Sequence, residues 1–207
     1  MADRKPIVLG SSGNLQEIDT STDGLDISLD KLSDVTYPST PAAGGKLAHN
    51  GSYWVSIPGG GFCGFRTSSF AVSSVSTWYA IGWNAETVKW GNLTHSTSTN
   101  PEEVVVAKPG IIRITTTISP AYVSGTLGMA HIKLQQYTGA VWADIVGSER
   151  ANVVRNTSGV HVSMATSMIH NFATSTKFRV MIKREGGSVI NIPAYFASVE
   201  AEYVNKG

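Results

Sequence analysis

The sequence predicts an all-β protein: an antiparallel jelly-roll sandwich preceded by an extended N-terminal arm and a small hairpin region. Residues 111–118 alternate apolar and polar side chains with the period of two that is typical of a half-buried strand. Similar short runs, separated by Gly, Pro and Asn turns, recur to the end of the chain. No segment has a convincing helical pattern, because the apolar cluster from Met164 to Phe172 is β-branched, Ser-rich and uncapped.

The 111–118 strand is expected to bury one face and to leave the other wettable. The apolar face carries Ile112, Ile114, Thr116 and Ile118, and the polar face carries Arg113, Thr115 and Thr117. Burial of the polar face as well would indicate contact with a neighbouring subunit. The other predicted strands are 70–75, 78–83, 104–107, 129–137, 151–154, 160–165, 178–183, 189–192 and 197–204.

Three regions are expected along the chain. Residues 1–36 form an extended arm, because their apolar residues are too sparse for a core of their own. Residues 37–64 form a linker and a β-hairpin, in which Lys46 to Val55 turns at Asn50-Gly51 and the triple glycine after Pro58 is a plausible hinge. Residues 65–207 form the jelly-roll domain.

Composition excludes several classes of partner. Of the 207 residues only 15% are charged and the net charge is +1, with seven acids and three bases in residues 1–40. Neither sign is clustered densely enough for nucleic-acid binding. Cys63 is the only cysteine, so no intrachain disulfide forms. No run approaches the ~20 apolar residues of a membrane helix, and the start lacks a signal-peptide core, so we expect synthesis in a reducing cytoplasm without membrane insertion.

No catalytic or metal-binding signature is present in the sequence. The five histidines are scattered without metal-ligand spacing, so neither a metal nor a cofactor is expected. No Gly-x-Ser-x-Gly elbow occurs, and Glu102 and Glu103 would point to opposite faces of a strand. We therefore expect a protein that is not an enzyme. Trp142, Tyr137 and His161 are the candidate receptor or glycan contacts, although aromatic residues at a subunit seam are the more common alternative.

Motifs in the first quarter of the chain resemble those of tailed-bacteriophage fibre and other virion proteins. In such proteins a Leu-Ser-Asp-Val element, here Leu32 to Val35, precedes Gly-x-Leu, here Gly45 to Leu47, and then a turn and a Trp-Val strand, here Trp54-Val55. The segment from Lys5 to Gly10 is similar to their N-termini. The resemblance implies that the arm attaches to the virion, and the candidate attachment residues are Pro6, Ile7, Val8, Leu9, Leu25, Ile27, Leu32 and Val35.

The second half resembles the trimeric jelly roll of the complement globular-head and tumour-necrosis-factor class. Val106 to Ile114 matches the entry into the central strand of that class, and Tyr195 to Ala201 matches its last strand. Two departures are Ile111-Ile112, where an aromatic residue is usual, and Val199 to Glu202, where a Phe-Ser-Gly run is usual. The resemblance implies a homotrimer packed around a threefold axis.

These observations lead to one expected function and one alternative. The first is a structural virion protein of a tailed bacteriophage, a capsid decoration or head fibre made in the host bacterial cytoplasm and displayed on the particle. Its partners would be two further copies of itself and phage capsid or tail proteins. The alternative is a tail-fibre tip that binds a host-surface receptor or glycan.

Overall fold

Every element that the computed structural model describes is a β-strand. The described residues are 59–122, 128–154 and 161–204, together with the backbone of five short strands before residue 58. In that early part, β1 (Ile7–Leu9) pairs antiparallel with β2 (Leu15–Glu17). β3 (Val35–Thr36) lies parallel to β5 (Trp54–Ile57).

The expected hairpin is confirmed by the pairing of β4 (Lys46–His49) with β5. The two strands are antiparallel, and their register runs from Lys46 opposite Ile57 to His49 opposite Trp54. The turn that joins them, with Asn50-Gly51, lies outside the described residues.

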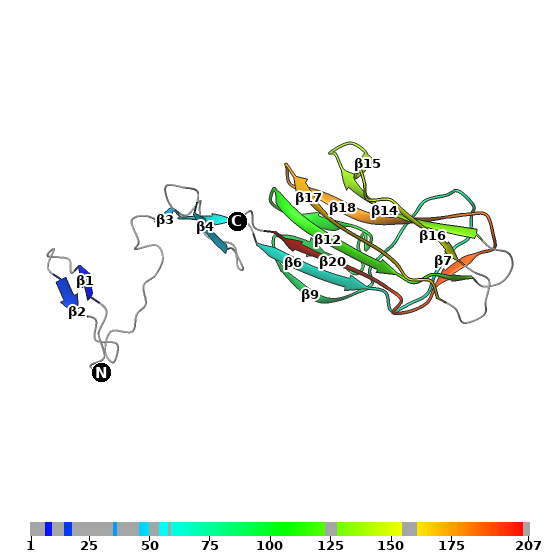
Figure 1. The fold of residues 1–207 in the computed structure, drawn as a ribbon, viewed down its shortest axis with the longest axis horizontal. Helices are drawn as coiled ribbons and strands as arrows, with labels where there is room; N and C mark the ends of the chain where they lie inside the picture. Colours follow the sequence, from blue (N-terminus) through cyan, green and yellow to red (C-terminus); the bar gives the residue numbers. More distant parts are fainter. Residues whose placement is uncertain are drawn as a thin grey trace.

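The first large sheet has the order β17-β12-β20-β6-β9, with every neighbouring pair antiparallel. Its last strand along the chain, β20, lies between β12 and β6 (Figure 1). The strands are β6 (Gly60–Phe65), β9 (Ala85–Gly91), β12 (Gly110–Ile118), β17 (Met164–Phe172) and β20 (Ala197–Tyr203).

The second large sheet has the order β10-β11-β18-β14-β15. In addition, β16 pairs with β14, and β8 pairs with β18. A small sheet, β13-β19-β7, covers one end of the sandwich. The strands of these two sheets are β7 (Phe70–Val72), β8 (Tyr79–Ala80), β10 (Leu93–His95), β11 (Val104–Val106), β13 (Ala121–Tyr122), β14 (Gly128–Tyr137), β15 (Trp142–Asp144), β16 (Arg150–Val154), β18 (Thr176–Glu185) and β19 (Ile190–Ile192).

The connectivity is that of a jelly roll. From β11 onward the long strands β12, β14, β17, β18 and β20 lie alternately in the two large sheets, and β20 pairs with β6, the first strand of the domain. The chain therefore enters at Gly60 and leaves at Tyr203 at the same end of the sandwich, which we call the proximal end (Figure 1). The other end, where β12 reaches Ile118 and β20 begins at Ala197, is the distal end.

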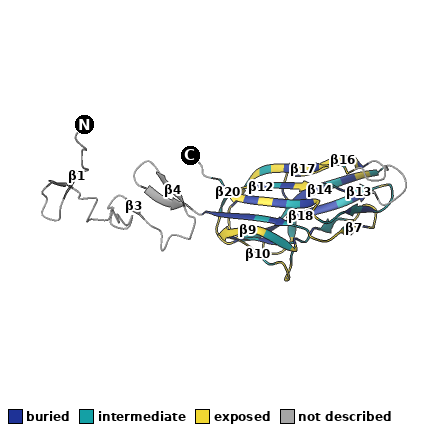
Figure 2. Ribbon diagram, turned by 90° about the horizontal axis from the view of Figure 1, so that it is seen from below, coloured by how far each residue is buried: buried dark blue, intermediate teal, exposed yellow. Residues whose placement is uncertain are grey.

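The core lies between the two large sheets. Its largest fully buried side chains include Trp83, Phe62, Phe172 and Phe178. In Figure 2 the buried residues run along the strands in alternation with exposed ones. The strand predicted at 111–118 is confirmed, because Ile112, Ile114, Thr116 and Ile118 are each 0% exposed while Arg113 and Thr117 are exposed.

Two expectations about strands are wrong. Residues 161–163 are not in a strand, and β17 occupies Met164–Phe172 instead. The apolar pattern did not mark β17, because this strand buries the polar side chain of Thr166 and exposes the apolar side chain of Ile169. The triple glycine is not a hinge: Gly60 and Gly61 begin β6, and a Cβ atom at Gly61 would lie 2.5 Å from Nε1 of Trp90.

Two buried threonines lie opposite each other on β12 and β17, and the side-chain hydroxyl of only one of them makes a hydrogen bond to a described residue. Thr116 pairs with Thr166 in the ladder, and both are at most 2% exposed. The hydroxyl of Thr166 donates to the carbonyl of Ser148 at 3.2 Å. The hydroxyl of Thr116 has no partner among the described residues. An unpaired buried hydroxyl costs free energy that an isosteric methyl group does not.

Replacing Thr116 by Val should therefore raise the free energy of unfolding by about 1 kcal/mol, because it removes an unsatisfied polar group without changing the volume. Thr166→Val is the matched control and should lower that free energy, because it leaves the Ser148 carbonyl unpaired. Urea unfolding of both variants measures the difference. A stabilised Thr166→Val variant, or a destabilised Thr116→Val variant, would contradict this assignment.

Candidate functional site

The outer face of the first large sheet is the most distinctive surface of the described residues. Three rows of side chains cross it, because the register aligns residues on successive strands. The row nearest the proximal end is Ile169, Arg113, Glu202, Gly61 and Trp90; the middle row is Ser167, Thr115, Glu200, Cys63 and Val88; the third is Ala165, Thr117, Ser198 and Phe65.

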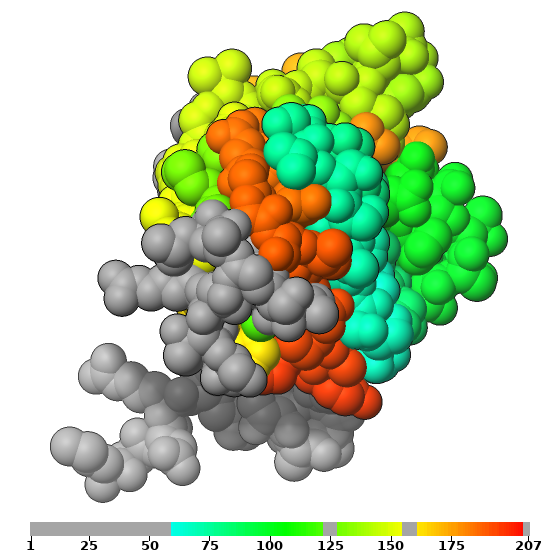
Figure 3. Space-filling view, turned by 90° about the vertical axis from the view of Figure 1, so that its right-hand side faces the viewer, coloured from blue at the N-terminus to red at the C-terminus, as the bar shows by residue number. Residues whose placement is uncertain are grey.

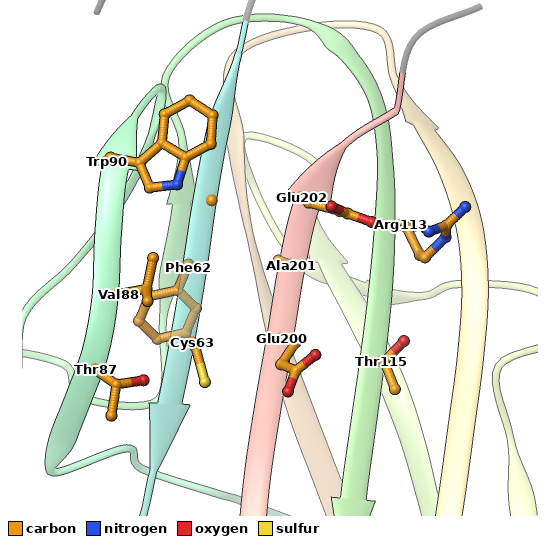
Figure 4. Close-up of a pocket in the computed structure, with 11 residues that line it drawn as sticks. Phe62, Cys63, Thr87, Val88, Trp90, Arg113, Thr115, Glu200, Ala201 and Glu202 are labelled. Carbon is orange, nitrogen blue, oxygen red and sulfur yellow. Dashed lines mark hydrogen bonds and ion pairs between the residues drawn. The ribbon is translucent and has the colours of Figure 1, made fainter. Parts of the chain in front are cut away.

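A shallow hollow of about 400 Å³ lies on this face, over β6 and β20 (Figure 4). Gly61 leaves room because it has no side chain, and Thr115 and Cys63 of the middle row are short. The indole of Trp90 forms one wall and lies against Gly61. Arg113 and Glu202 form the opposite wall, joined by an ion pair of 2.8 Å between Nη1 and Oε1.

The hollow has the character of a contact surface and lacks a catalytic arrangement. Glu200 makes no ion pair to a described residue, and Thr115 and Ser167 share a hydrogen bond of 2.9 Å between their hydroxyls. No group of three or more His, Cys, Asp or Glu in the described residues is placed to hold a metal ion. What the face offers is exposed apolar area beside a charged pair.

Three large hydrophobic residues around the hollow are exposed. Val88 is 45% exposed, Trp90 41% and Ile169 57%. All three lie on the same face of the sheet, at its two edge strands. Exposed apolar groups that gather on one surface of a folded protein usually mark an interaction site.

The expected glycan contacts do not come together in one site. Tyr137 and Trp142 lie opposite each other on β14 and β15, with ring centroids 5.4 Å apart, near the proximal end. His161 lies at the distal end, where its ring stacks on Phe196 at 4.4 Å. Trp142 is half-buried. The three residues therefore stay predictions, divided between two surfaces.

Half of the eight expected attachment residues cannot be placed. Pro6, Leu25, Ile27 and Leu32 lie outside the described residues. Ile7, Val8 and Leu9 form β1, and Val35 begins β3. Their role in attachment stays a prediction.

The distal end carries a pair of exposed aromatic residues that were not expected to be contact residues. Tyr195 is 70% exposed and Phe196 is 42% exposed. Figure 3 faces this end, where the orange-to-red segment that includes β19 lies beside the teal segment that includes β7. In the sequence the two residues were noted only as the beginning of the segment, Tyr195 to Ala201, that resembles a last jelly-roll strand, whereas β20 begins at Ala197.

Tyr195 has a backbone conformation that is unusual for a large residue. Its φ is 68°, and Phe196 N–H donates to the carbonyl of Pro193 at 3.2 Å. A turn with a positive φ only at its third residue is of type II, which normally places Gly there. Tyr195 N–H is also held by the carbonyl of Arg66 at 2.7 Å, and its ring stacks on Phe65. Strained residues of this kind gather at functional surfaces.

Comparisons with known proteins find only solved structures of low similarity. No family model matches the chain, and no curated protein matches it. Crystal structures of murine APRIL are similar. The one at pH 5.0 has a TM-score of 0.49 and 9% identity, and that at pH 8.5 a TM-score of 0.48 and 10% identity, each over 70% of this chain and 99% of the other. At this level nothing about binding or assembly is carried over.

By its own strand order the chain is an antiparallel jelly-roll protein. Among the described residues no helix could cross a membrane. The virion and trimer expectations are taken up below as proposals.

Replacing Tyr195 by Gly should cost less stability than replacing Phe196 by Gly, by about 1 kcal/mol, because only the first change relieves left-handed backbone strain. Phe196 has no such strain, and its substitution loses the stack on His161. Guanidinium unfolding of the two variants measures the difference. If Tyr195→Gly is the more destabilising of the two, the strained turn is not present in solution.

Proposed function

We propose that this chain is a structural virion protein of a tailed bacteriophage: a homotrimeric capsid decoration or head-fibre protein, anchored by residues 1–36, with the jelly roll projecting from the particle. The observation that carries the proposal is the outer face of the first large sheet, where exposed Val88 and Trp90 line a shallow hollow and Ile169 is exposed on the opposite edge strand. The face is suited to packing against further copies of the same chain.

The chemistry of the face supports self-association. Trp and Arg are enriched at protein interfaces, and Trp90 and Arg113 stand on opposite walls of the hollow. Val88 and Ile169 add apolar area at the two edge strands. Gly61 and the short side chains of Thr115 and Cys63 leave room in the hollow for a side chain of a neighbouring copy. In a trimer the polar face of β12, which is open in the single chain, would be covered.

The course of the chain supports a projecting domain. β6 begins and β20 ends at the proximal end, so the residues before Gly59 join the jelly roll there (Figure 1). The loops at the distal end then face away from the point of attachment. Three arms held in one trimer raise each other's effective concentration, so weak single contacts combine into firm attachment.

The virion assignment itself rests on the motifs of the first quarter of the chain. Their order, from Lys5 through Leu32 to Trp54-Val55, resembles that of fibre and other virion proteins. The acidic residues of the arm distinguish it from the remainder of the chain. The protein would be made in the host bacterial cytoplasm and displayed on the particle surface, with capsid or tail proteins as partners.

A tail-fibre tip that binds a host-surface receptor or glycan is the second candidate. The exposed pair Tyr195 and Phe196, with His161 stacked on Phe196, favours it. In a projecting domain this aromatic surface at the distal end would be the part that meets a host cell first. Imaging labelled protein on intact virions separates the two candidates, since one places it on the head and the other on the tail.

The assembly is tested by light scattering of the full chain after size exclusion. We expect a trimer, and Val88→Glu should shift it toward monomer, because a charge then enters the apolar surface. Val153→Glu is the matched control, since Val153 is 46% exposed on β16 of the other sheet and should leave the trimer intact. A monomeric wild-type protein at micromolar concentration, or equal effects of both variants, would disprove this interface.

Attachment is tested by deleting residues 1–36. The truncated protein should still fold and form a trimer, because the jelly roll has its own core, but should no longer sediment with virions that lack the native protein. The full chain, added to the same virions, is the control. If the truncated form attaches as well as the full chain, the arm is not the anchor.

A further inference from the structure

A group of aromatic and polar side chains on the outer face of the second large sheet has no part in the proposed assembly. The register places Arg179 opposite Gln135, and Gln135 opposite Asp144. In the next row toward the proximal end, Tyr137 lies opposite Trp142. These residues come from three neighbouring strands, β18, β14 and β15 (Figure 1).

Arg179 is held in one orientation from two sides. Its guanidinium lies over the ring of Trp142, 4.1 Å from the ring centre. Its Nε and Nη2 both donate to Oε1 of Gln135, at 3.0 and 2.8 Å. Gln135 is fixed in turn, because its Nε2 donates to Asp144 at 2.8 Å. The remaining nitrogen, Nη1, makes no hydrogen bond to any residue that the structure describes.

Arg179 differs from the neighbouring lysines in the group that it is hydrogen-bonded to. Lys133 is paired with Asp144 and Lys177 with Glu103, each at 2.7 Å. Arg179 has only a neutral amide oxygen at hydrogen-bond distance. Burial lowers the pKa of Arg179, and the more distant Glu102 and Glu103 partly offset that effect. A partly buried cation without a bonded carboxylate is stabilised by an anionic partner.

A second hollow, of about 380 Å³, adjoins Tyr137. Tyr137 and Lys177 line it, together with three hydroxyl-bearing residues, Thr174 and Ser175 of the turn between β17 and β18 and Thr176, which begins β18. A tyrosine ring with hydroxyl groups and an ammonium group around it suits the apolar face and the hydroxyls of a pyranose ring. Tyr137, which lines the hollow, packs on Trp142, and Trp142 in turn lies under Arg179.

We infer that this surface binds an acidic oligosaccharide, with one pyranose ring in the hollow against Tyr137 and the carboxylate of a neighbouring sugar on Nη1 of Arg179. Trp142 and Gln135 are the positioning residues, because they hold the guanidinium in one orientation through Nε, Nη2 and its face. Carboxylate recognition by an oriented guanidinium is strong and directional. Because the surface lies on the second sheet, the inference does not depend on the assembly proposed above.

The test uses the full chain and one tetrasaccharide of alternating N-acetylglucosamine and glucuronic acid, beside the same tetrasaccharide with its carboxyl groups reduced to alcohols. Isothermal titration calorimetry should show that the acidic form binds about tenfold more tightly than the reduced form. That ratio corresponds to the free energy of one charge-assisted hydrogen bond. Arg179→Gln should lower the affinity for the acidic form about tenfold and abolish the preference between the two sugars. Tyr137→Leu should weaken both sugars, because it removes the ring.

Arg150→Gln is the matched control. It makes the same change of charge on the same sheet, at a side chain that bonds only to the carbonyls of Gly147 and Glu149, and should leave both affinities unchanged. Thermal unfolding shows whether each variant is folded. Equal binding of the two sugars, binding that survives Arg179→Gln, or no binding of either sugar by the unaltered protein would each overturn the inference.

Discussion

The packing of the two large sheets against each other is the constraint on which the rest of this structure depends. Each long strand must keep one face apolar for that contact, so the other face is free to vary. β12 shows the division most clearly, with isoleucines inward and Arg113, Thr115 and Thr117 outward. The candidate surfaces on both sheets are made from these free faces, held in rows by the hydrogen-bonded register beneath them.

The sequence was most informative where a strand has one buried and one exposed face. Residues 111–118 and 178–183 alternate at most positions, and both lie within strands of the structure. β9 was missed for the opposite reason: as an edge strand it is exposed along most of its length, so Glu86 to Trp90 carry no apolar period. β6 was missed because its glycines read as a hinge, whereas Gly61 is needed where Trp90 packs on the sheet.

The candidate sites could be predicted only in part, because they depend on pairing between distant segments. Tyr137 and Trp142 stood out as aromatic residues near a turn, and they do lie together. Arg179 gave no signal of its own, since its environment is set by Gln135, 44 positions away in the sequence. The hollow beside Trp90 likewise joins residues of four strands, β6, β9, β12 and β20, and no local pattern encodes such a meeting.

The central position of β20 has a consequence for synthesis. Of the five strands of the first sheet, the last to be synthesised is the one that joins β12 to β6, so before it is made the sheet can hold only two separate pairs, β12 with β17 and β6 with β9. Each pair has an open edge of unpaired backbone groups, which is a template for wrong pairing. The sheet is completed only once β20 has been synthesised, and any association between copies that uses its outer face must come later still.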